Sequence, residues 1–235
     1  DLVRSRGLGD VYKRQVLTPE TKVGEFIEEA RQSVTRMFPT LRDNPDYTAI
    51  IAQNHYERIT GYIDDARAKG AQVVELNPAG EDFSQQPYRK IPPTLILNPT
   101  DDMAVMQEEI FGPVLPVKTY RGTQEAIDYV NGHERPLALY WFGTDEAEKD
   151  RVLTQTTSGG ATVNDVIFHV AQEELPFGGI GPSGMGSYHG HDGFKEFSHR
   201  KSVYSQLKKD IGPLQRMRPP YGPAIAGYLK GAIKH

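Results

Sequence analysis

The chain has 235 residues, a formal net charge of -4 and no cysteine. The absence of cysteine excludes disulfides, thiolate metal sites and a cysteine nucleophile. Charges of both signs are spread along the chain without a basic block, which argues against nucleic acid or an anionic membrane surface as a partner. The sequence has no apolar run of transmembrane length and no secretory signal pattern, so we expect a cytoplasmic protein.

The first 15 residues differ in character from the rest of the chain. They contain four basic residues and two glycines without a clear period. We interpret residues 1–15 as a non-native or disordered leader and exclude them from the fold argument, with a flexible native terminus as the alternative.

Two amphipathic helices are predicted in the first third of the chain. Thr18 is placed to cap the first helix, and Pro19 suits its first helical position. Apolar residues follow at helical spacing: Val23, Phe26, Ile27, Ala30 and Val34. The second helix is predicted over Asn54–Lys69 and ends at Gly70. Its apolar side consists of Tyr56, Ile59, Tyr62, Ile63 and Ala66.

Short strands alternate with further helices downstream. The predicted strands are Gln72–Leu76, Thr94–Leu97, Pro113–Tyr120, Leu137–Phe142 and Ala161–Asn164. Pro116 predicts that its strand lies at a sheet edge, and the continuous apolar run Leu137–Phe142 is typical of a strand buried on both faces. Helices are predicted at Thr123–Val130, capped by Thr123, at Asp145–Gln155, and after Pro223. The alternation indicates an α/β fold with a mostly parallel sheet and flanking helices.

The stretch Gln107–Val114 places two carboxylates before an apolar pair and a Gly-Pro break. The break predicts a sharp turn, with Phe111 beside it and Glu109 on the same side if the segment is extended. A carboxylate accepts sugar hydroxyls and an aromatic face stacks on a flat ring, so this pair suits a nicotinamide riboside. On spacing alone, a solvated acidic pair and a core phenylalanine are the better supported interpretation.

Gly179–Gly184 matches the dinucleotide-binding pattern G-x-G-x-x-G in its letters. That loop follows a strand and opens a helix, whereas here Pro176 and Phe177 precede the pattern and Pro182 lies inside it. We therefore reject the phosphate-binding interpretation and predict a tight loop packed against other backbone.

Three other groupings carry weaker signals. Imidazole and carboxylate groups gather at His189, His191, Asp192 and His199. These groups suit a metal ion, but their spacing fits no established zinc signature. Ser183 and Ser187 lie outside the G-x-S-x-G pattern of serine hydrolases. Asn164 ends a strand and His169 follows it, where ligand-facing residues often occur, although a turn asparagine and a satisfied core histidine are the alternative.

Several stretches occur in an order that resembles the aldehyde dehydrogenase superfamily. The matching stretches are Glu108–Val114, Thr157–His169, Leu175–His199, Tyr47–Ile51 and Ala68–Pro78. Within the superfamily the chain is most similar to the class 3 branch and its bacterial coniferyl aldehyde dehydrogenases. The resemblance implies that residues 16–200 form the catalytic domain, which lies in the C-terminal half of the family chain. It implies an oligomerisation strand and a Pro/Gly-rich tail for residues 201–235.

The resemblance also implies roles for individual residues. Glu109 resembles the glutamate that holds the nicotinamide ribose hydroxyls, and Phe111 resembles the phenylalanine that backs the nicotinamide ring. Polar contacts to the same ribose fall at His55 and Arg58. Residues that line the aldehyde tunnel fall at Asn164, His169 and Phe177. Lys201–Tyr204 resembles the start of a strand that packs against a partner subunit.

The family reaction starts with a cysteine thiolate, transfers hydride to NAD or NADP, and ends when a glutamate activates water to hydrolyse a thioester. This chain has no cysteine and no visible counterpart of that glutamate, so we predict no catalytic residue and no metal site in it. We expect a fragment of a homodimeric NAD(P)-dependent dehydrogenase that oxidises an aromatic, coniferaldehyde-like aldehyde, with the fragment inactive alone. A non-enzymatic interaction module is the alternative.

Overall fold

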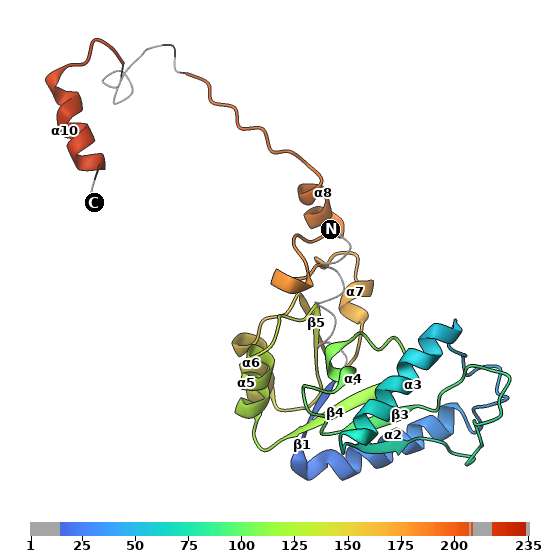
Figure 1. Cartoon of the computed structure of the whole chain (residues 1–235). Helices are drawn as coiled ribbons and strands as arrows, with labels where there is room; N and C mark the ends of the chain where they lie inside the picture. Colours follow the sequence, from blue (N-terminus) through green and yellow to red (C-terminus); the bar gives the residue numbers. More distant parts are fainter. Residues whose placement is uncertain (1–14, 207, 209–217, 234–235) are drawn as a thin grey trace. The chain divides into compact units, whose positions relative to one another are not determined.

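The computed structural model describes residues 15–206, 208 and 218–233, and most of the predicted leader therefore lies outside the described residues. The chain divides into two compact units, one that ends at Phe197 and one that begins at Ser198. Figure 1 shows the elements of both. No helix among the described residues is long and apolar enough to cross a membrane.

The first unit contains a four-stranded sheet in the order β1-β4-β3-β2. In that order its strands are Val16–Pro19, Val114–Tyr120, Thr94–Leu97 and Gln72–Glu75. The first three are parallel, and β2 runs antiparallel to β3. A second, two-stranded parallel sheet joins β5 (Ala138–Trp141) to β6 (Gly160–Val163). The prediction of a mostly parallel α/β fold is confirmed.

Alternation along β3 builds a core on each face of the larger sheet. Ile96 packs on the side of α3 (Gln53–Ala68), whereas Leu95 and Leu97 pack on the side of α2 (Val23–Met37). Because successive strand side chains point to opposite faces, a fully apolar strand needs a helix on each side. Figure 1 shows α2 and α3 lying along this sheet. The predicted apolar side of α3 is buried at Ile59 and at the other positions named above, except that Tyr56 is half-buried.

The remaining elements are short. They are η1 (Glu20–Lys22), α4 (Ala104–Gln107), α5 (Thr123–Asn131), α6 (Glu146–Gln155), α7 (Phe168–Ala171), η2 (Gly181–Ser183) and α8 (Gly190–Glu196). Asp145 caps α6 by accepting a hydrogen bond from the Glu148 amide at 3.0 Å. In the second unit, α10 covers Pro223–Ala232, which confirms the helix predicted after Pro223.

The predicted start of the first helix is wrong. Thr18 and Pro19 belong to β1, and the α-helix begins only at Val23, after a 3₁₀ turn. Thr18 pairs with Thr119 of β4, so tertiary pairing outweighs the local capping signal. Thr123 is likewise not a cap, because Gly122 occupies that position and the Thr123 hydroxyl donates to the Glu148 carboxylate.

Pro116 lies in a central strand, so the predicted sheet edge is also wrong. Its strand β4 pairs with β1 on one side and β3 on the other. The Pro113 carbonyl accepts from Thr94 of β3, and the Val117 carbonyl accepts from Asn98 directly after β3. By strand alternation the missing N–H of Pro116 falls on the opposite side, toward β1. The proline ring is fully buried, so Pro116 belongs to the core of the sheet.

The strand β5 is not buried on both faces as predicted. Trp141 is buried, but Tyr140 is 36% exposed and Phe142 beyond the strand end is 62% exposed. Within the described residues β5 pairs with β6 alone. Its apolar character therefore leaves side chains at the surface of the first unit.

Candidate functional site

The predicted cofactor-facing segment joins α4 to β4. Ile110 is 3% exposed and anchors the segment in the core, whereas Phe111 is 58% exposed. Phe111 has a φ of +44°, in the left-handed region that a bulky residue seldom adopts. The extended conformation assumed for this segment is therefore wrong at Phe111, because the backbone turns there and leaves the ring at the surface.

Helix α3 contacts the backbone of this segment through Arg58 and Ile59. Arg58 donates to the carbonyl of Glu109, to the carbonyl of Ile110 at 3.0 Å, and to the Tyr62 hydroxyl at 2.9 Å. A Cβ added to Gly112 would lie 2.5 Å from Ile59 Cδ1, so the backbone at Gly112 lies close against the Ile59 side chain. Arg58, predicted to contact the ribose, is thus bound to the backbone of the segment.

The chemistry of this surface fits the nicotinamide end of a dinucleotide. The Glu109 side chain is half-buried, and the predicted ribose contact His55 is exposed on the first turn of α3. Ribose hydroxyls are donors that a carboxylate accepts well, and the exposed Phe111 ring offers an apolar face to a flat heterocycle. The structure brings Glu109, Phe111 and Arg58 together around one short turn.

The predicted substrate residue Asn164 lies immediately after β6. Its Oδ1 accepts from the Gly143 amide at 2.8 Å, and its Nδ2 donates to the Gly143 carbonyl at 3.0 Å. Asn164 has a φ of +55°, which asparagine tolerates better than most residues. The Asn164 side-chain amide thereby links the end of β6 to the backbone of Gly143, two residues beyond the end of β5.

His169 lies on α7, against the strand β6. It is 7% exposed, its Nδ1 lies 2.9 Å from Thr162 Oγ1, and burial lowers its pKa. A Cβ on Gly160 would lie 2.6 Å from His169 Cδ2. Its Nε2 finds no hydrogen-bond partner among the residues that the structure describes. His169 is therefore a neutral, packed imidazole that fastens α7 to β6.

Phe177 lies beside His169, with ring centroids 6.0 Å apart. Phe177 also meets the Tyr188 ring edge-on at 5.5 Å and stacks on His189 at 5.9 Å. The backbones of Phe177 and Tyr188 exchange two hydrogen bonds. Tyr188 and His189 thus belong to the same aromatic cluster. The sequence alone did not predict that these four aromatic rings lie together, because no residue spacing relates His169 to the glycine-rich loop.

The glycine-rich segment is packed against its own backbone, which confirms the predicted tight loop. A Cβ on Gly179 would lie 2.0 Å from the Ser183 carbonyl oxygen, and one on Gly178 would lie 2.1 Å from the Gly186 oxygen. The Ser183 hydroxyl accepts from the Ile180 amide at 2.9 Å. The Ser183 hydroxyl also donates to the Ile180 carbonyl at 3.1 Å, so this side chain binds the backbone of its own loop.

The grouping of histidine and aspartate does not assemble into a metal site among the described residues. No three side chains of His, Cys, Asp or Glu lie together there in a way that could hold a metal ion. Asp192 is paired with Lys195 at 2.6 Å, and this cation lowers the pKa of the Asp192 carboxyl.

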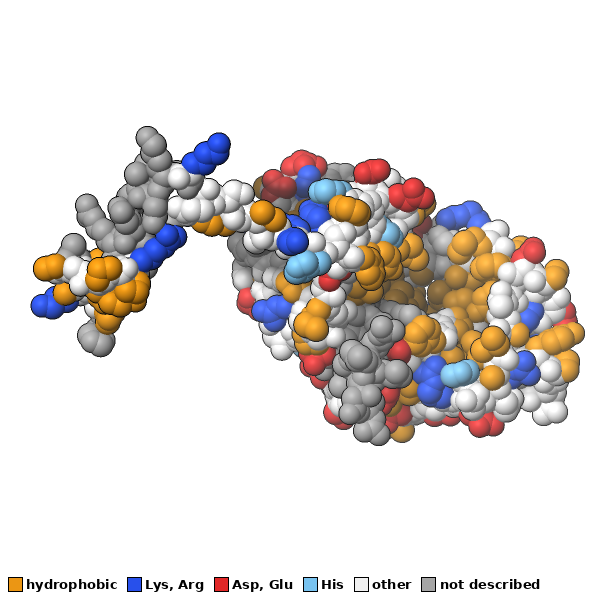
Figure 2. Space-filling view, turned by 90° about the horizontal axis from the view of Figure 1, so that it is seen from above, with side chains coloured by type: hydrophobic (Ala, Val, Ile, Leu, Met, Phe, Trp, Pro, Cys, Tyr) orange, Lys and Arg blue, Asp and Glu red, His pale blue; other side chains and the backbone are white. Residues whose placement is uncertain are grey.

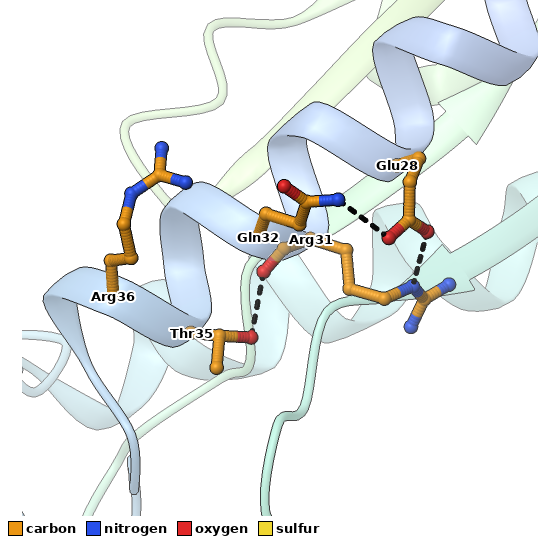
Figure 3. Close-up of a pocket in the computed structure, with 5 residues that line it drawn as sticks. All are labelled: Glu28, Arg31, Gln32, Thr35 and Arg36. Atoms are coloured by element: carbon orange, nitrogen blue, oxygen red, sulfur yellow. Dashed lines mark hydrogen bonds and ion pairs between the residues drawn. The ribbon is translucent and has the colours of Figure 1, made fainter.

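One hollow in the described surface lies on the exposed side of α2, away from the predicted site residues (Figure 3). Its lining residues are Glu28, Arg31, Gln32, Thr35 and Arg36. They bond to one another along the helix: Gln32 donates to Glu28 at 3.0 Å, and Thr35 donates to the Arg31 carbonyl at 2.8 Å. The hollow is therefore lined by polar side chains on the solvent-exposed face of α2.

Apolar side chains are exposed along the segment from the end of β6 to α8. They include Val166, Ile167, Phe168, Leu175, Ile180, Met185, Tyr188, Phe194 and Phe197. Ile167 is 61% exposed and has a φ of +68°. Figure 2 views the molecule from the side where Figure 1 draws α7 and α8, and it shows hydrophobic side chains gathered on that face. An uncovered apolar surface of this extent is typical of a region that packs against other protein or a ligand.

Comparisons with known proteins agree with the order of these motifs. The model of the aldehyde dehydrogenase family matches residues 12–203. A probable coniferyl aldehyde dehydrogenase of Caulobacter vibrioides is 73% identical over 93% of this chain and 45% of its own length. A coniferyl aldehyde dehydrogenase of a Pseudomonas species is 52% identical over 91% of this chain and 44% of its own length.

The fold is also similar to that of solved structures. The substrate-bound state of AldH from Staphylococcus aureus superposes with a TM-score of 0.74 and 34% identity, over 94% of this chain and 46% of that one. A salicylaldehyde dehydrogenase from Pseudomonas putida, in complex with salicylaldehyde, gives a TM-score of 0.69 at 25% identity, over 86% of this chain and 41% of that one. The chain thus spans about half the length of the relatives it matches.

Proposed function

Because the chain belongs to the aldehyde dehydrogenase family, we propose that it forms the nicotinamide-facing and aldehyde-facing part of an NAD(P)-dependent dehydrogenase. The reaction is the oxidation of an aldehyde to the carboxylic acid, and the bound dinucleotide accepts the hydride. The names of the two most similar relatives reported above support an aromatic, coniferaldehyde-like substrate. The coenzyme is NAD or NADP, since both nucleotides carry the same nicotinamide riboside.

The observation that carries the proposal is the turn at Phe111. Glu109 accepts the ribose hydroxyls, and the exposed Phe111 ring supports the nicotinamide. His55 adds a polar contact from the first turn of α3. The aldehyde lies along the surface formed by Phe177, His169 and the turn after Asn164, whose apolar side chains exclude water from the substrate. The Asn164 and His169 side chains set the shape of this surface through their contacts with Gly143 and Thr162.

This chain has no cysteine and therefore supplies no thiolate. A carboxylate such as that of Glu109 does not replace it, because an acyl group on a carboxylate is an anhydride and not the thioester of the family reaction. We accordingly propose that the 235-residue chain is inactive alone, and that the complete dehydrogenase is a cytoplasmic homodimer to whose interface Lys201–Tyr204 contributes. In this single chain Lys201–Tyr204 has no regular secondary structure.

Two assays of the purified chain test this proposal. The first mixes the chain with NAD⁺ or NADP⁺ and coniferaldehyde or benzaldehyde and follows absorbance of the reduced coenzyme. We expect no increase above the blank, and a sustained increase would contradict the assignment of inactivity to the missing thiol.

The second assay measures calorimetric binding of nicotinamide mononucleotide. Glu109→Gln weakens binding about tenfold, because a carboxylate accepts hydroxyl hydrogen bonds more strongly than a neutral amide does. Glu108→Gln is the matched control, since the exposed Glu108 has the same charge and adjoins Glu109. Equal weakening by both variants would indicate a general charge effect and would overturn the role given to Glu109.

An assembly role without catalysis is the second candidate, and it is favoured by the exposed apolar segment between β6 and α8 together with the absence of cysteine. This candidate predicts that the wild-type chain does not bind nicotinamide mononucleotide at any accessible concentration. The same calorimetric titration therefore distinguishes the two functions.

A further inference from the structure

We propose that Arg58 is a positioning residue for the coenzyme surface, which it serves by fixing the backbone of Glu109 and Ile110. The inference rests on the proposed function, because the position of this backbone matters only if Glu109 and Phe111 receive a nicotinamide riboside. It differs from the expectation that Arg58 touches the ribose itself. The inference is supported by the hydrogen bonds of the Arg58 guanidinium and by the backbone geometry of the turn at Phe111.

The guanidinium of Arg58 is matched to two successive carbonyls. Nη1 donates to the Glu109 carbonyl and to the Tyr62 hydroxyl at 2.9 Å, and Nη2 donates to the Ile110 carbonyl at 3.0 Å. The guanidinium carbon also lies 5.2 Å from the centroid of the Tyr62 ring, which restricts its orientation. Three of the five N–H groups are used in these contacts. A planar fork makes such paired contacts, whereas a lysine ammonium on a flexible stem does not.

The two held carbonyls immediately precede the unusual turn. Phe111 has a φ of +44°, a conformation that persists in a bulky residue only when the surroundings determine it. On the other side of the turn, Gly112 lies against Ile59 so closely that an added Cβ would be 2.5 Å from Cδ1. Arg58 and Ile59, which are neighbours on α3, therefore support the turn before and after Phe111. With the backbone fixed at both points, the ring is held at the surface.

The same helix also holds the beginning of the segment. Asp65 Oδ2 accepts from the Ala104 amide at 2.8 Å, and Lys69 Nζ donates to the Asp102 carbonyl at 2.7 Å. Arg58 and Asp65 are seven residues apart, which places them two helical turns apart on one side of α3. Side chains of α3 thus bind the backbone of residues 102–112 at several points, and Arg58 makes the contact nearest to the coenzyme surface.

Backbone order measured by ¹⁵N relaxation in the purified chain tests the inference. In the wild type we expect order parameters of about 0.85 for Glu109–Gly112, and in Arg58→Met we expect values below about 0.6. Arg67→Met is the matched control, because Arg67 lies on the same helix and pairs with Asp64 and Glu75 at the surface. Unchanged order in Arg58→Met, or an equal loss in Arg67→Met, would overturn the inference.

Arg58→Lys keeps the charge and removes the planar fork. We expect the order parameters of Glu109–Gly112 to fall in this variant as well, while those of Val114–Tyr120 stay at wild-type values and report an intact sheet. If a protein with lysine retains full order at the turn, positive charge alone is sufficient and the inference is wrong. This variant also provides the test if Arg58→Met does not fold.

Titration with nicotinamide mononucleotide separates this inference from the proposed function. Roughly tenfold weaker binding in Arg58→Lys, together with lost order at the turn, supports positioning. Weaker binding with unchanged order would identify Arg58 as a direct contact and overturn it. Lost order in the variants combined with no binding by the wild type would support the backbone role of Arg58 while contradicting the coenzyme function of the chain.

Discussion

The segment Glu108–Gly112 and the segment from Asn164 to Phe197 use their side chains in opposite ways. In the first, the backbone is held from behind by α3, and the Phe111 ring is left at the surface. In the second, the polar side chains bind the chain itself: Asn164 binds Gly143, His169 binds Thr162 and Ser183 binds Ile180. The first segment is therefore held through its backbone, whereas the second is held through its own polar side chains.

The largest effect is expected where the second segment packs on its own backbone. Gly179→Ala places a methyl group 2.0 Å from the Ser183 carbonyl oxygen, and we expect it to lower the free energy of unfolding by about 3 kcal/mol. The urea midpoint measures this loss. Gly61→Ala in α3 is the control, because nothing lies within 4 Å of its added Cβ and helical alanine stabilises by roughly 0.5–1 kcal/mol. Similar midpoints for the two variants would refute the close packing of the loop.

A smaller loss is expected when the link between the ends of β5 and β6 is removed. Asn164→Ala deletes both hydrogen bonds to Gly143 and places alanine at a φ of +55°. We expect a loss of about 2 kcal/mol from these two causes. Asn164→Gly deletes the same bonds but accepts the backbone conformation, so it should lose roughly half as much. Chemical denaturation of both variants measures their free energies of unfolding. A glycine variant less stable than the alanine variant would contradict this explanation.

The regular elements of the fold and the turns in these two segments differ in how far they could be predicted. The strand Thr94–Leu97 and the apolar side of α3 were predicted correctly. Both are signalled by the positions of apolar residues along the sequence. The left-handed turns at Phe111 and Ile167 carry no such signal, since neither residue type favours a positive φ.

The partners of the site residues were hidden from sequence for a related reason. Arg58 binds carbonyls 51 and 52 positions away, and Asn164 binds a glycine 21 positions away. A backbone acceptor leaves no pattern in the residue types, so these contacts appear only in the folded chain. Pro116 was wrongly predicted to lie at a sheet edge. The sequence shows that its N–H is missing but not which neighbouring strand that position faces.

The smallest expected effect depends on pH and concerns His169. Burial lowers the pKa of His169 in the fold, while the unfolded chain keeps a value of about 6.5. Below pH 6.5 the unfolded state binds more protons, so the stability contributed by neutral His169 is complete above that pH and is lost as the pH falls through the folded pKa.

Denaturation at pH 7.5 and at pH 5.5 measures this effect. His169→Gln should show a smaller loss of stability on acidification than the wild type. An unchanged pH dependence in His169→Gln would show that the imidazole is not held neutral by burial.

The most direct test of the central claim maps amide chemical shifts of the chain on addition of nicotinamide mononucleotide. The account predicts that the largest shifts occur at Glu109–Gly112 and in the first turns of α3 around His55 and Arg58. Shifts concentrated in the glycine-rich loop Gly178–Gly186, or on the α2 face around Arg31 and Thr35, would contradict it.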